Sequence, residues 1–406
     1  MATRIAPRRS SARASWLATI LAVWMAPGVA GVLAVDQIDL VSNETTLHPA
    51  LVDPNLRNAW GVSYGPPTPF WVSANHSGLA LVYTVSSSTD AVSKAPVEVT
   101  IPGFGGGTGN PTGQVFNPDS GAFNGDVFLF VSEDGTVSGW RPSFGTTGTA
   151  EVLATGSPDN VYKGVALATI SGNTYLYAAN FHTATIDITK GTPGAPDLTG
   201  KFTDPNLPAG FAPFNIQNLD GTLYVTYAHP DPNNPEDDAG GPGQGFVDGF
   251  DLQGNMLGRI GTMGTLNSPW GLAIAPASFG AIAGDLLVGN FGDGRINVFD
   301  LGTKSFVGQL DAAGGGALSI DGLWALSVGD GGNAGSLGEV YFSAGPDDEA
   351  NGLFGALRPI GAVPEPGTLA LVAASLLGVV LDSRRSRRLA RRFIRRSAGA
   401  HGFPGG

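Results

Sequence analysis

The sequence has no cysteine, and only 14% of its 406 residues are charged. The lack of cysteine excludes disulfides, thiolate metal sites, iron–sulfur clusters and cysteine nucleophiles. So few charged residues exclude a coiled coil or long exposed helices. Glycine and proline are abundant instead, at 61 and 29 residues. Short apolar runs broken by Gly, Pro, Asn and Asp predict an all-β protein with a hydrophobic core.

Charge is distributed unevenly along the chain. Residues 35–361 carry 10 Lys or Arg and 32 Asp or Glu, whereas both ends of the chain are rich in arginine. An acidic surface repels nucleic acid phosphates, so we expect no nucleic acid partner. The basic ends have the composition of targeting segments.

Residues 1–34 have the pattern of a secretory signal peptide. Four arginines precede an apolar run over residues 16–26, and small residues follow a Pro-Gly pair. Ala30 and Ala34 both satisfy the small-residue rule for cleavage. An uncleaved signal anchor is the alternative interpretation.

The C-terminal end has three parts in a fixed order. Pro364, Glu365 and Pro366 precede an apolar run over residues 368–381, and eight arginines follow between Arg384 and Arg396. Fourteen apolar residues form a helix of roughly 21 Å, which needs its flanking arginines to reach across a hydrocarbon core of about 30 Å. The arginines should stay cytoplasmic, which places residues 35–361 outside the inner membrane. A plain tail anchor is the alternative.

This three-part end resembles the bacterial PEP-CTERM sorting signal, over residues 362–396, with residues 397–406 as an additional tail. The resemblance implies processing near the Pro-Glu-Pro by an exosortase-type membrane protease. It also implies membrane attachment through the C-terminal helix before processing. The destination would then be the cell surface or an exopolysaccharide matrix.

Residues 35–361 contain six repeats. Each repeat begins with a strand that carries a small residue near its start, and these residues are 51 to 56 positions apart: Gly61, Gly113, Gly164, Asn215, Gly271 and Ala325. A second strand follows in each repeat, then a third, and in some repeats a fourth. Six repeats of about four strands predict a six-bladed β-propeller. Two packed β-sandwich domains are the alternative.

The last repeat has no fourth strand of its own, and the segment Gln37–Val41 is unassigned at the front of the body. We therefore expect this segment to pair into the last blade and close the ring, which also removes a free sheet edge. The segment 286–300 resembles an NHL-type propeller repeat. With the C-terminal signal, the chain resembles a family of exported six-bladed, NHL- or TolB-like propellers, a resemblance that implies no particular chemistry.

In a propeller, the loops between blades and the turns after the second strands lie on one face around the channel. This places a set of polar and aromatic residues together: Asn58, Trp60, Asn75, His76, Glu133, Asp134, Lys163, Asn180, His182, Tyr227, His229, Trp270, Asn290 and Trp324. Such a face could stack sugars or hold a divalent ion. The alternative is structural: the asparagines after the second strands fit tight turns with positive φ, and the tryptophans fit packing between blades.

Metal ligation has weak support in the sequence. His76, His182 and His229 end second strands of three different blades, and no carboxylate spacing fixes a zinc geometry. Four acids in one long loop, Asp231, Glu236, Asp237 and Asp238, could bind Ca²⁺ weakly but lack the EF-hand order. Residues 347–349 form a similar acidic group.

No nucleophile elbow, phosphate-binding loop or HExxH sequence is present. The sequence therefore favours a non-enzymatic surface or matrix protein that binds a glycan or protein and needs no cofactor. The second hypothesis is a metal-dependent hydrolase, by analogy with lactonase-type propellers, with Glu133, Asn180 and Asn290 around one ion in the channel.

Overall fold

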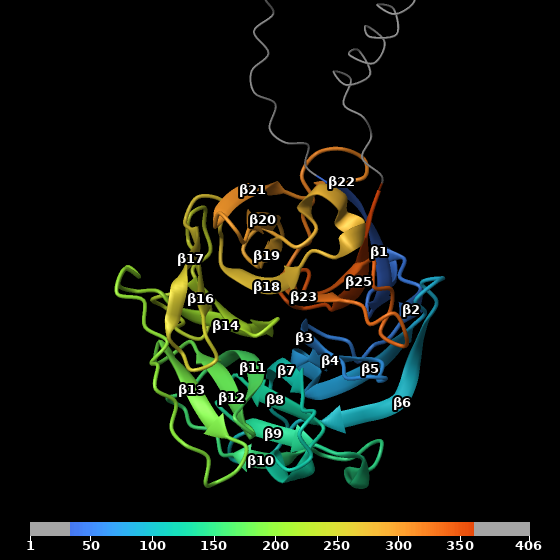
Figure 1. Ribbon diagram of the computed structural model, residues 1–406. Helices are drawn as coiled ribbons and strands as arrows, with labels where there is room; N and C mark the ends of the chain where they lie inside the picture. Colours follow the sequence, from blue (N-terminus) through green and yellow to red (C-terminus); the bar gives the residue numbers. More distant parts are fainter. Residues whose placement is uncertain (1–32, 361–406) are drawn as a thin grey trace, which may run out of the picture.

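The computed structural model describes residues 33–360, which form six β-sheets arranged around a common centre (Figure 1). The first two sheets contain β3 (Ala59–Ser63), β4 (Phe70–Ala74), β5 (Leu79–Val85) and β6 (Val92–Thr100), and then β7 (Pro111–Phe116), β8 (Phe128–Ser132), β9 (Val137–Trp140) and β10 (Glu151–Ala154). The third and fourth contain β11 (Tyr162–Ile170), β12 (Asn173–Asn180) and β13 (Thr185–Lys190), and then β14 (Ala212–Leu219), β15 (Thr222–Ala228), β16 (Phe246–Phe250) and β17 (Met256–Thr262).

The fifth sheet contains β18 (Pro269–Ile274), β19 (Leu286–Asn290), β20 (Ile296–Asp300) and β21 (Ser305–Gln309). The sixth is built on β23 (Leu323–Val328), β24 (Val340–Ala344), β25 (Leu353–Pro359) and β1 (Ala34–Ser42), with the two-residue strands β2 (Leu51–Val52) and β22 (Asp311–Ala312) paired to β1. Short 3₁₀ helices lie in the connections: Thr45–Leu47, Asn75–Ser77, Phe123–Gly125, Pro142–Phe144 and Ala277–Ile282. The protein is an all-β six-bladed propeller, as the repeats predict.

The small residue of each repeat is explained by the approach of neighbouring blades. The first strands of the repeats are innermost, and they contact one another in the circular order β3, β7, β11, β14, β18, β23 and back to β3. A Cβ atom at Gly61 would lie 2.4 Å from the Thr112 carbonyl oxygen, and one at Gly113 would lie 2.7 Å from the Val165 nitrogen. Glycine therefore lets adjacent inner strands come into backbone contact near the axis.

Blade three has three strands where four are expected. The segment after β13 contains Pro193 and Pro196. Proline has no N–H to donate to a strand ladder, so this segment forms no fourth strand.

Blade six contains strands from both ends of the described chain. β1 pairs antiparallel with β25 over Val35 to Ser42, with a register shift between Asp39 and Val41. The predicted pairing of Gln37–Val41 into the last blade is therefore present. Val35 on one side and Leu40 and Val41 on the other are buried in two separate hydrophobic clusters. β1 thus contributes to the core on both faces of the blade.

The predicted membrane helix, over residues 368–381, and Pro364, Glu365 and Pro366 lie outside the described residues, as does most of the predicted signal peptide. Within residues 33–360, no helix is long and apolar enough to cross a membrane.

Candidate functional site at the two ends of the channel

Aromatic side chains fill the middle of the ring. Trp60 and Trp324 stack with ring centroids 3.6 Å apart, Phe291 stacks on Trp324 at 4.0 Å, and Trp270 meets Trp324 edge-on. Phe214 lies against the same group. Trp60, Trp270 and Trp324 are only 1%, 4% and 1% exposed. The faces of Trp60 and Trp324 are covered by stacked rings, and Trp270 is buried edge-on against Trp324. This arrangement fits the packing interpretation of these tryptophans rather than an open stacking surface.

One end of the channel carries a hydrogen-bonded charged network, which we call the polar mouth: Asn58, Asn75, Glu133, Lys163 and Glu349. The Lys163 ammonium lies 2.5 Å from Glu133 Oε1, and Asn75 Nδ2 donates to Glu133 Oε2 at 3.1 Å. Asn58 Nδ2 donates to Glu349 Oε2 at 3.0 Å and lies 3.4 Å from Asn75 Oδ1. The network connects residues of blades one, two, three and six.

The polar mouth rests directly on the aromatic residues. The Lys163 ammonium lies 4.9 Å from the Trp60 ring centroid, and Trp324 Nε1 donates to Asn58 Oδ1 at 3.0 Å. Asn58 adopts a left-handed φ of 46°, and Glu349 follows two further left-handed residues with its own φ of 65°. Positive φ is unfavourable for residues other than glycine. These backbones are held by the contacts their side chains make.

Burial raises the pKa of the Glu349 carboxyl to about 7. Lys163 opposes this shift, while Glu133, Asp237 and Asp238 add to it. For Lys163, burial acts to lower the pKa, but Glu133 and then Glu349 and Asp237 outweigh burial and raise it. Lys163 is therefore charged, and Glu349 titrates near neutral pH.

Glu349 should give the protein a measurable pH dependence of stability. Its pKa rises from 4.5 to about 7 on folding, so between these pH values the folded chain holds a proton that the unfolded chain releases. The free energy of unfolding should therefore fall by roughly 2–3 kcal/mol as the pH rises through this window. Urea unfolding at a series of pH values measures it. Glu349→Gln should remove this part of the slope, whereas Glu236→Gln, in an exposed loop, should keep it; equal slopes for Glu349→Gln and wild type would contradict the assignment.

The other predicted residues of this face form none of the side-chain hydrogen bonds of the polar mouth, but His76 lies beside it. Burial lowers the pKa of His76, while Glu133 and the Glu349 backbone act to raise it. His76 and His182 are exposed. His229 is half-buried, with Nδ1 2.9 Å from the Pro230 carbonyl oxygen and its ring against Phe211. Asp134 accepts hydrogen bonds from the backbone N–H groups of Phe104 and Thr136, and Tyr227 is buried in the core.

The asparagines after the second strands stabilise turns through their side chains. Asn75, Asn180 and Asn290 have negative φ, so the expected left-handed turn conformation is wrong for all three. Asn180 accepts from the Val161 N–H and donates to Asp187. Asn290 donates to the Thr265 carbonyl and to Asp293.

The side chains of the proposed metal set and of the acidic loop form hydrogen bonds with other protein groups. Glu133 bonds to Lys163 and Asn75, while Asn180 and Asn290 each bond within their own blade regions. In the loop, Asp231 accepts from Asn233 and Asp237 accepts from Asn234; Glu236 and Asp237 are exposed and Asp238 is half-buried. Across residues 33–360, no group of three or more His, Asp or Glu side chains is placed to hold a metal ion.

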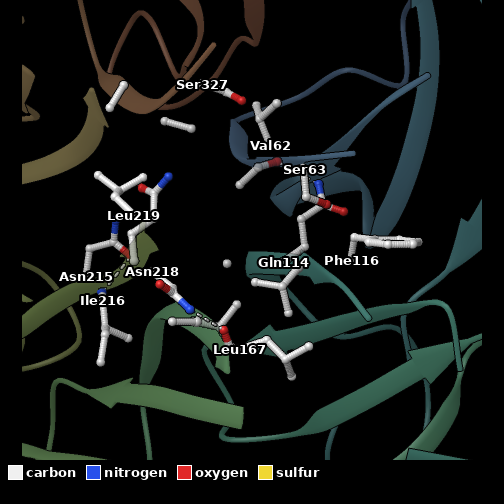
Figure 2. Close-up of a pocket in the computed structure, with 18 of the residues that line it drawn as sticks. Val62, Ser63, Gln114, Phe116, Leu167, Asn215, Ile216, Asn218, Leu219 and Ser327 are labelled. Carbon is white, nitrogen blue, oxygen red and sulfur yellow. Dashed lines mark hydrogen bonds between the residues drawn. The ribbon is translucent and has the colours of Figure 1, made fainter. Parts of the chain in front are cut away.

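The other end of the channel holds a cavity of about 690 Å³, which sequence patterns did not predict. Its walls come from the C-terminal halves of the six innermost strands, and Figure 2 shows side chains from several blades around an open centre. Apolar side chains make up slightly more than half of the wall, and polar side chains of the same strands make up the rest. The apolar ones include Val62, Val115, Phe116, Val165, Leu167, Ile216, Leu219, Trp270, Ile274, Leu326 and Val328. We call this space the channel cavity.

Most polar side chains in the cavity wall bond to neighbouring backbone. Gln114 Nε2 donates to the carbonyls of Gly61 and Trp71, and Asn218 Nδ2 donates to that of Leu167. The Tyr64 hydroxyl donates to the Val328 carbonyl at 2.8 Å. Burial raises the pKa of Tyr64, so it stays a neutral phenol. Among the lining residues, Asp220 is the one carboxylate, and it is exposed.

The fold and channel define the protein as a six-bladed β-propeller. A solved structure with this architecture is that of an α-L-arabinofuranosidase from Fusarium graminearum, which is 13% identical, with a TM-score of 0.50 and coverage of 80% of this chain and 97% of that one. At this identity the likeness shows the fold alone.

Sequence relatives define the family. The uncharacterized protein L690 of Acanthamoeba polyphaga mimivirus is 34% identical over 336 residues, which cover 78% of this chain and 84% of L690. Protein R648 of the same virus is 32% identical over 334 residues, covering 78% of each chain. The chain belongs to the family of these mimivirus proteins. In addition, residues 362–385 match the PEP-CTERM protein-sorting motif, which indicates export and sorting by an exosortase-type system.

Proposed function

We propose that this protein is an exported, surface-sorted propeller that binds an uncharged ligand with an aliphatic portion in its channel cavity. The observation that carries the proposal is the cavity itself, whose walls come from all six blades. Its volume lies in the range of small-molecule sites, which are concave and mostly apolar. The proposal makes the protein a binding component rather than an enzyme.

The chemistry of the cavity wall supports binding over catalysis. General acid–base and nucleophilic mechanisms need at least two reactive groups in mutual reach. The wall offers Asp220 and the neutral Tyr64, and the Tyr64 hydroxyl is already bonded to a carbonyl. An anionic ligand would find no Lys or Arg in the wall to pair with, and the one carboxylate with which a cationic ligand could pair, Asp220, is exposed. An uncharged ligand is therefore favoured.

The same wall favours an aliphatic ligand portion over a bare sugar. Sugars stack on exposed aromatic faces, but Trp60 and Trp324 are covered by other rings and Trp270 is 4% exposed. Val62, Leu167 and Leu219 offer aliphatic surface instead (Figure 2). A glycan or a protein ligand fits this site through an attached alkyl chain or an apolar side chain, with its polar part at the rim near Gln217 and Asp220.

In this proposal, the two ends of the chain direct its export. A signal peptide over residues 1–34 directs export, and the segment 368–381 holds the chain in the inner membrane until an exosortase-type protease acts near Pro364, Glu365 and Pro366. The PEP-CTERM match at residues 362–385 supports this route. The destination is the cell surface or the extracellular matrix, and β1 closes the ring of the exported propeller.

Alkyl glucosides test the ligand class, because the sugar is constant and the chain length varies. We expect hexyl and octyl glucoside, below their micelle concentrations, to bind in isothermal titration, and methyl glucoside to show no binding. Each added CH₂ should tighten Kd by about fourfold, as expected for about 0.8 kcal/mol per buried methylene. Equal affinity for methyl and octyl glucoside would contradict an aliphatic site.

A substitution in the wall localises the binding. Ser327 lines the cavity, and its side chain is half-buried. Ser327→Trp should fill the cavity and weaken octyl glucoside binding at least tenfold, while Ser327→Ala should bind as wild type. His182→Trp, at an exposed position on the other face, is the size-matched control. Unchanged affinity in a folded Ser327→Trp variant would place the ligand elsewhere.

A further inference from the structure

The described residues start and finish at the end of the propeller that holds the channel cavity, which we call the cavity end. Val328 lines the cavity and pairs with Val340, which in turn pairs with Leu357 of β25. Two residues further on, Pro359 pairs with Val35 of β1, beside it in blade six (Figure 1). Both β1 and β25 therefore meet the rest of the chain at the cavity end, and the polar mouth lies at the opposite end.

Three loops at the cavity end form a continuous surface over blades five, six and one. Ser278 Oγ donates to the Gly338 carbonyl at 2.6 Å, which joins the β18–β19 loop to the β23–β24 loop. Asn333 Nδ2 donates to the Pro67 carbonyl at 3.1 Å, which joins the β23–β24 loop to the β3–β4 loop. These loops expose a set of apolar side chains that we call the apolar rim: Pro66, Pro67, Ala277, Ala281 and Leu337.

The loops of the apolar rim, residues 64–69, 275–285 and 329–339, expose no charged side chain. They contain no Lys or Arg, Asp285 and Asp330 are half-buried, and Glu339 is 5% exposed. Leu337 is 64% exposed, more than any other large hydrophobic side chain in residues 33–360. An exposed apolar surface of this kind indicates an interaction site with a protein or a membrane.

Charge distinguishes the two ends of the propeller as membrane surfaces. At the end with the polar mouth, Glu236 and Asp237 of the acidic loop and Asp347 and Asp348 beside Glu349 are all exposed. Anionic lipid headgroups repel such carboxylates. Of the two ends, the cavity end is therefore the one suited to a lipid surface.

The length of chain after Ile360 limits how the propeller can lie on a membrane. The predicted membrane segment starts at residue 368, eight residues after Ile360. Eight fully extended residues span at most about 29 Å. A domain of about 330 residues has a radius of gyration of about 20 Å, which makes it roughly 50 Å across. The connection is too short to pass from the cavity end around the body to the polar mouth.

We propose that the apolar rim contacts the lipid bilayer while the segment 368–381 holds the chain in the inner membrane. This inference rests on the membrane attachment in the proposed function. The channel cavity then lies at the end that faces the lipid, and the acidic polar mouth points away from it. An uncleaved N-terminal anchor would give the same orientation, because β1 also begins at the cavity end.

Fluorescence quenching by labelled lipid tests this orientation, and the absence of native cysteine allows single labels. Leu337→Cys and Glu236→Cys, each in the full chain, are labelled with bimane and reconstituted into phosphatidylcholine–phosphatidylglycerol vesicles. Half of the samples contain a phosphatidylcholine with a nitroxide near its headgroup. A side chain that enters the boundary between headgroups and acyl chains, roughly 5–10 Å deep, meets this nitroxide. We expect the nitroxide to lower the emission at position 337 at least twofold and to leave position 236 unchanged.

Flotation of the vesicles distinguishes the ways in which the proposal could fail. Protein that floats with the vesicles but is quenched equally at both positions, or more at position 236, overturns the orientation and leaves membrane attachment in place. Protein that does not float overturns both the orientation and the membrane attachment of the proposed function. Ala281→Cys, in the blade-five loop of the apolar rim, is a second label position and should be quenched like position 337. An unquenched label at position 281 would overturn contact through the rim.

Discussion

Replacing Glu133 by glutamine should lower the free energy of unfolding by about 3 kcal/mol, in the range measured when one partner of a buried ion pair is removed. Lys163 is 3% exposed at its side chain, and Glu133 is its ion-pair partner at 2.5 Å. Burial alone acts to lower the Lys163 pKa, so the charge of Lys163 depends on the nearby carboxylates. Without Glu133, the buried Lys163 ammonium remains over the Trp60 ring. Glu349 then offsets its positive charge less well than Glu133 does.

Urea unfolding of two variants separates this effect from simple loss of packing. Glu133→Gln leaves a buried charge, whereas Lys163→Met combined with Glu133→Gln leaves none. We expect the double variant to be more stable than Glu133→Gln alone, because neutral pairs avoid the desolvation cost. A Glu133→Gln variant within 0.5 kcal/mol of wild type would show that the ion pair does not stabilise the ring.

Replacing Val41 by aspartate should destabilise the protein by at least about 4 kcal/mol, enough to leave much of the chain unfolded. Val41 is fully buried, pairs with Phe354 of β25, and belongs to the cluster shared by blades one and six. A carboxylate there has no cation to pair with. The inner and outer strands of these two blades would lose their common core.

The matched control lies on the same strand. Gln37 pairs with Leu357 but is exposed, so Gln37→Asp adds the same charge without burying it. Circular dichroism melts should show an early transition for Val41→Asp and a near-normal one for Gln37→Asp. Equal melting temperatures for Val41→Asp and wild type would mean that β1 is dispensable for the fold.

The architecture was predictable because each repeat meets the same local constraint. Gly61, Gly113 and Gly271 recur where a Cβ would collide with the backbone of the next inner strand, so the spacing of small residues reports the spacing of blades. The missing fourth strand of blade three was less obvious. Pro193 and Pro196 indicate it, but only once the strand positions around them are known.

The sequence predicts part of the polar mouth at one end of the channel, but not the cavity at the other end. The sequence predicts Glu133 and Lys163 on one face because blade topology brings second-strand ends and inter-blade loops together. It does not predict Glu349 there, because the position of Glu349 depends on a left-handed turn in a loop. No sequence pattern indicates the channel cavity. Its lining residues alternate as ordinary core strands do, and the space between them depends on blade number and side-chain volumes.

A crystal structure grown with octyl glucoside below its micelle concentration tests the central claim most directly. We predict an ordered alkyl chain in the channel cavity, in contact with Val62, Leu167 and Leu219, with the sugar at the rim. Density for the ligand only at the polar mouth, or an empty cavity at a saturating concentration, would contradict the account.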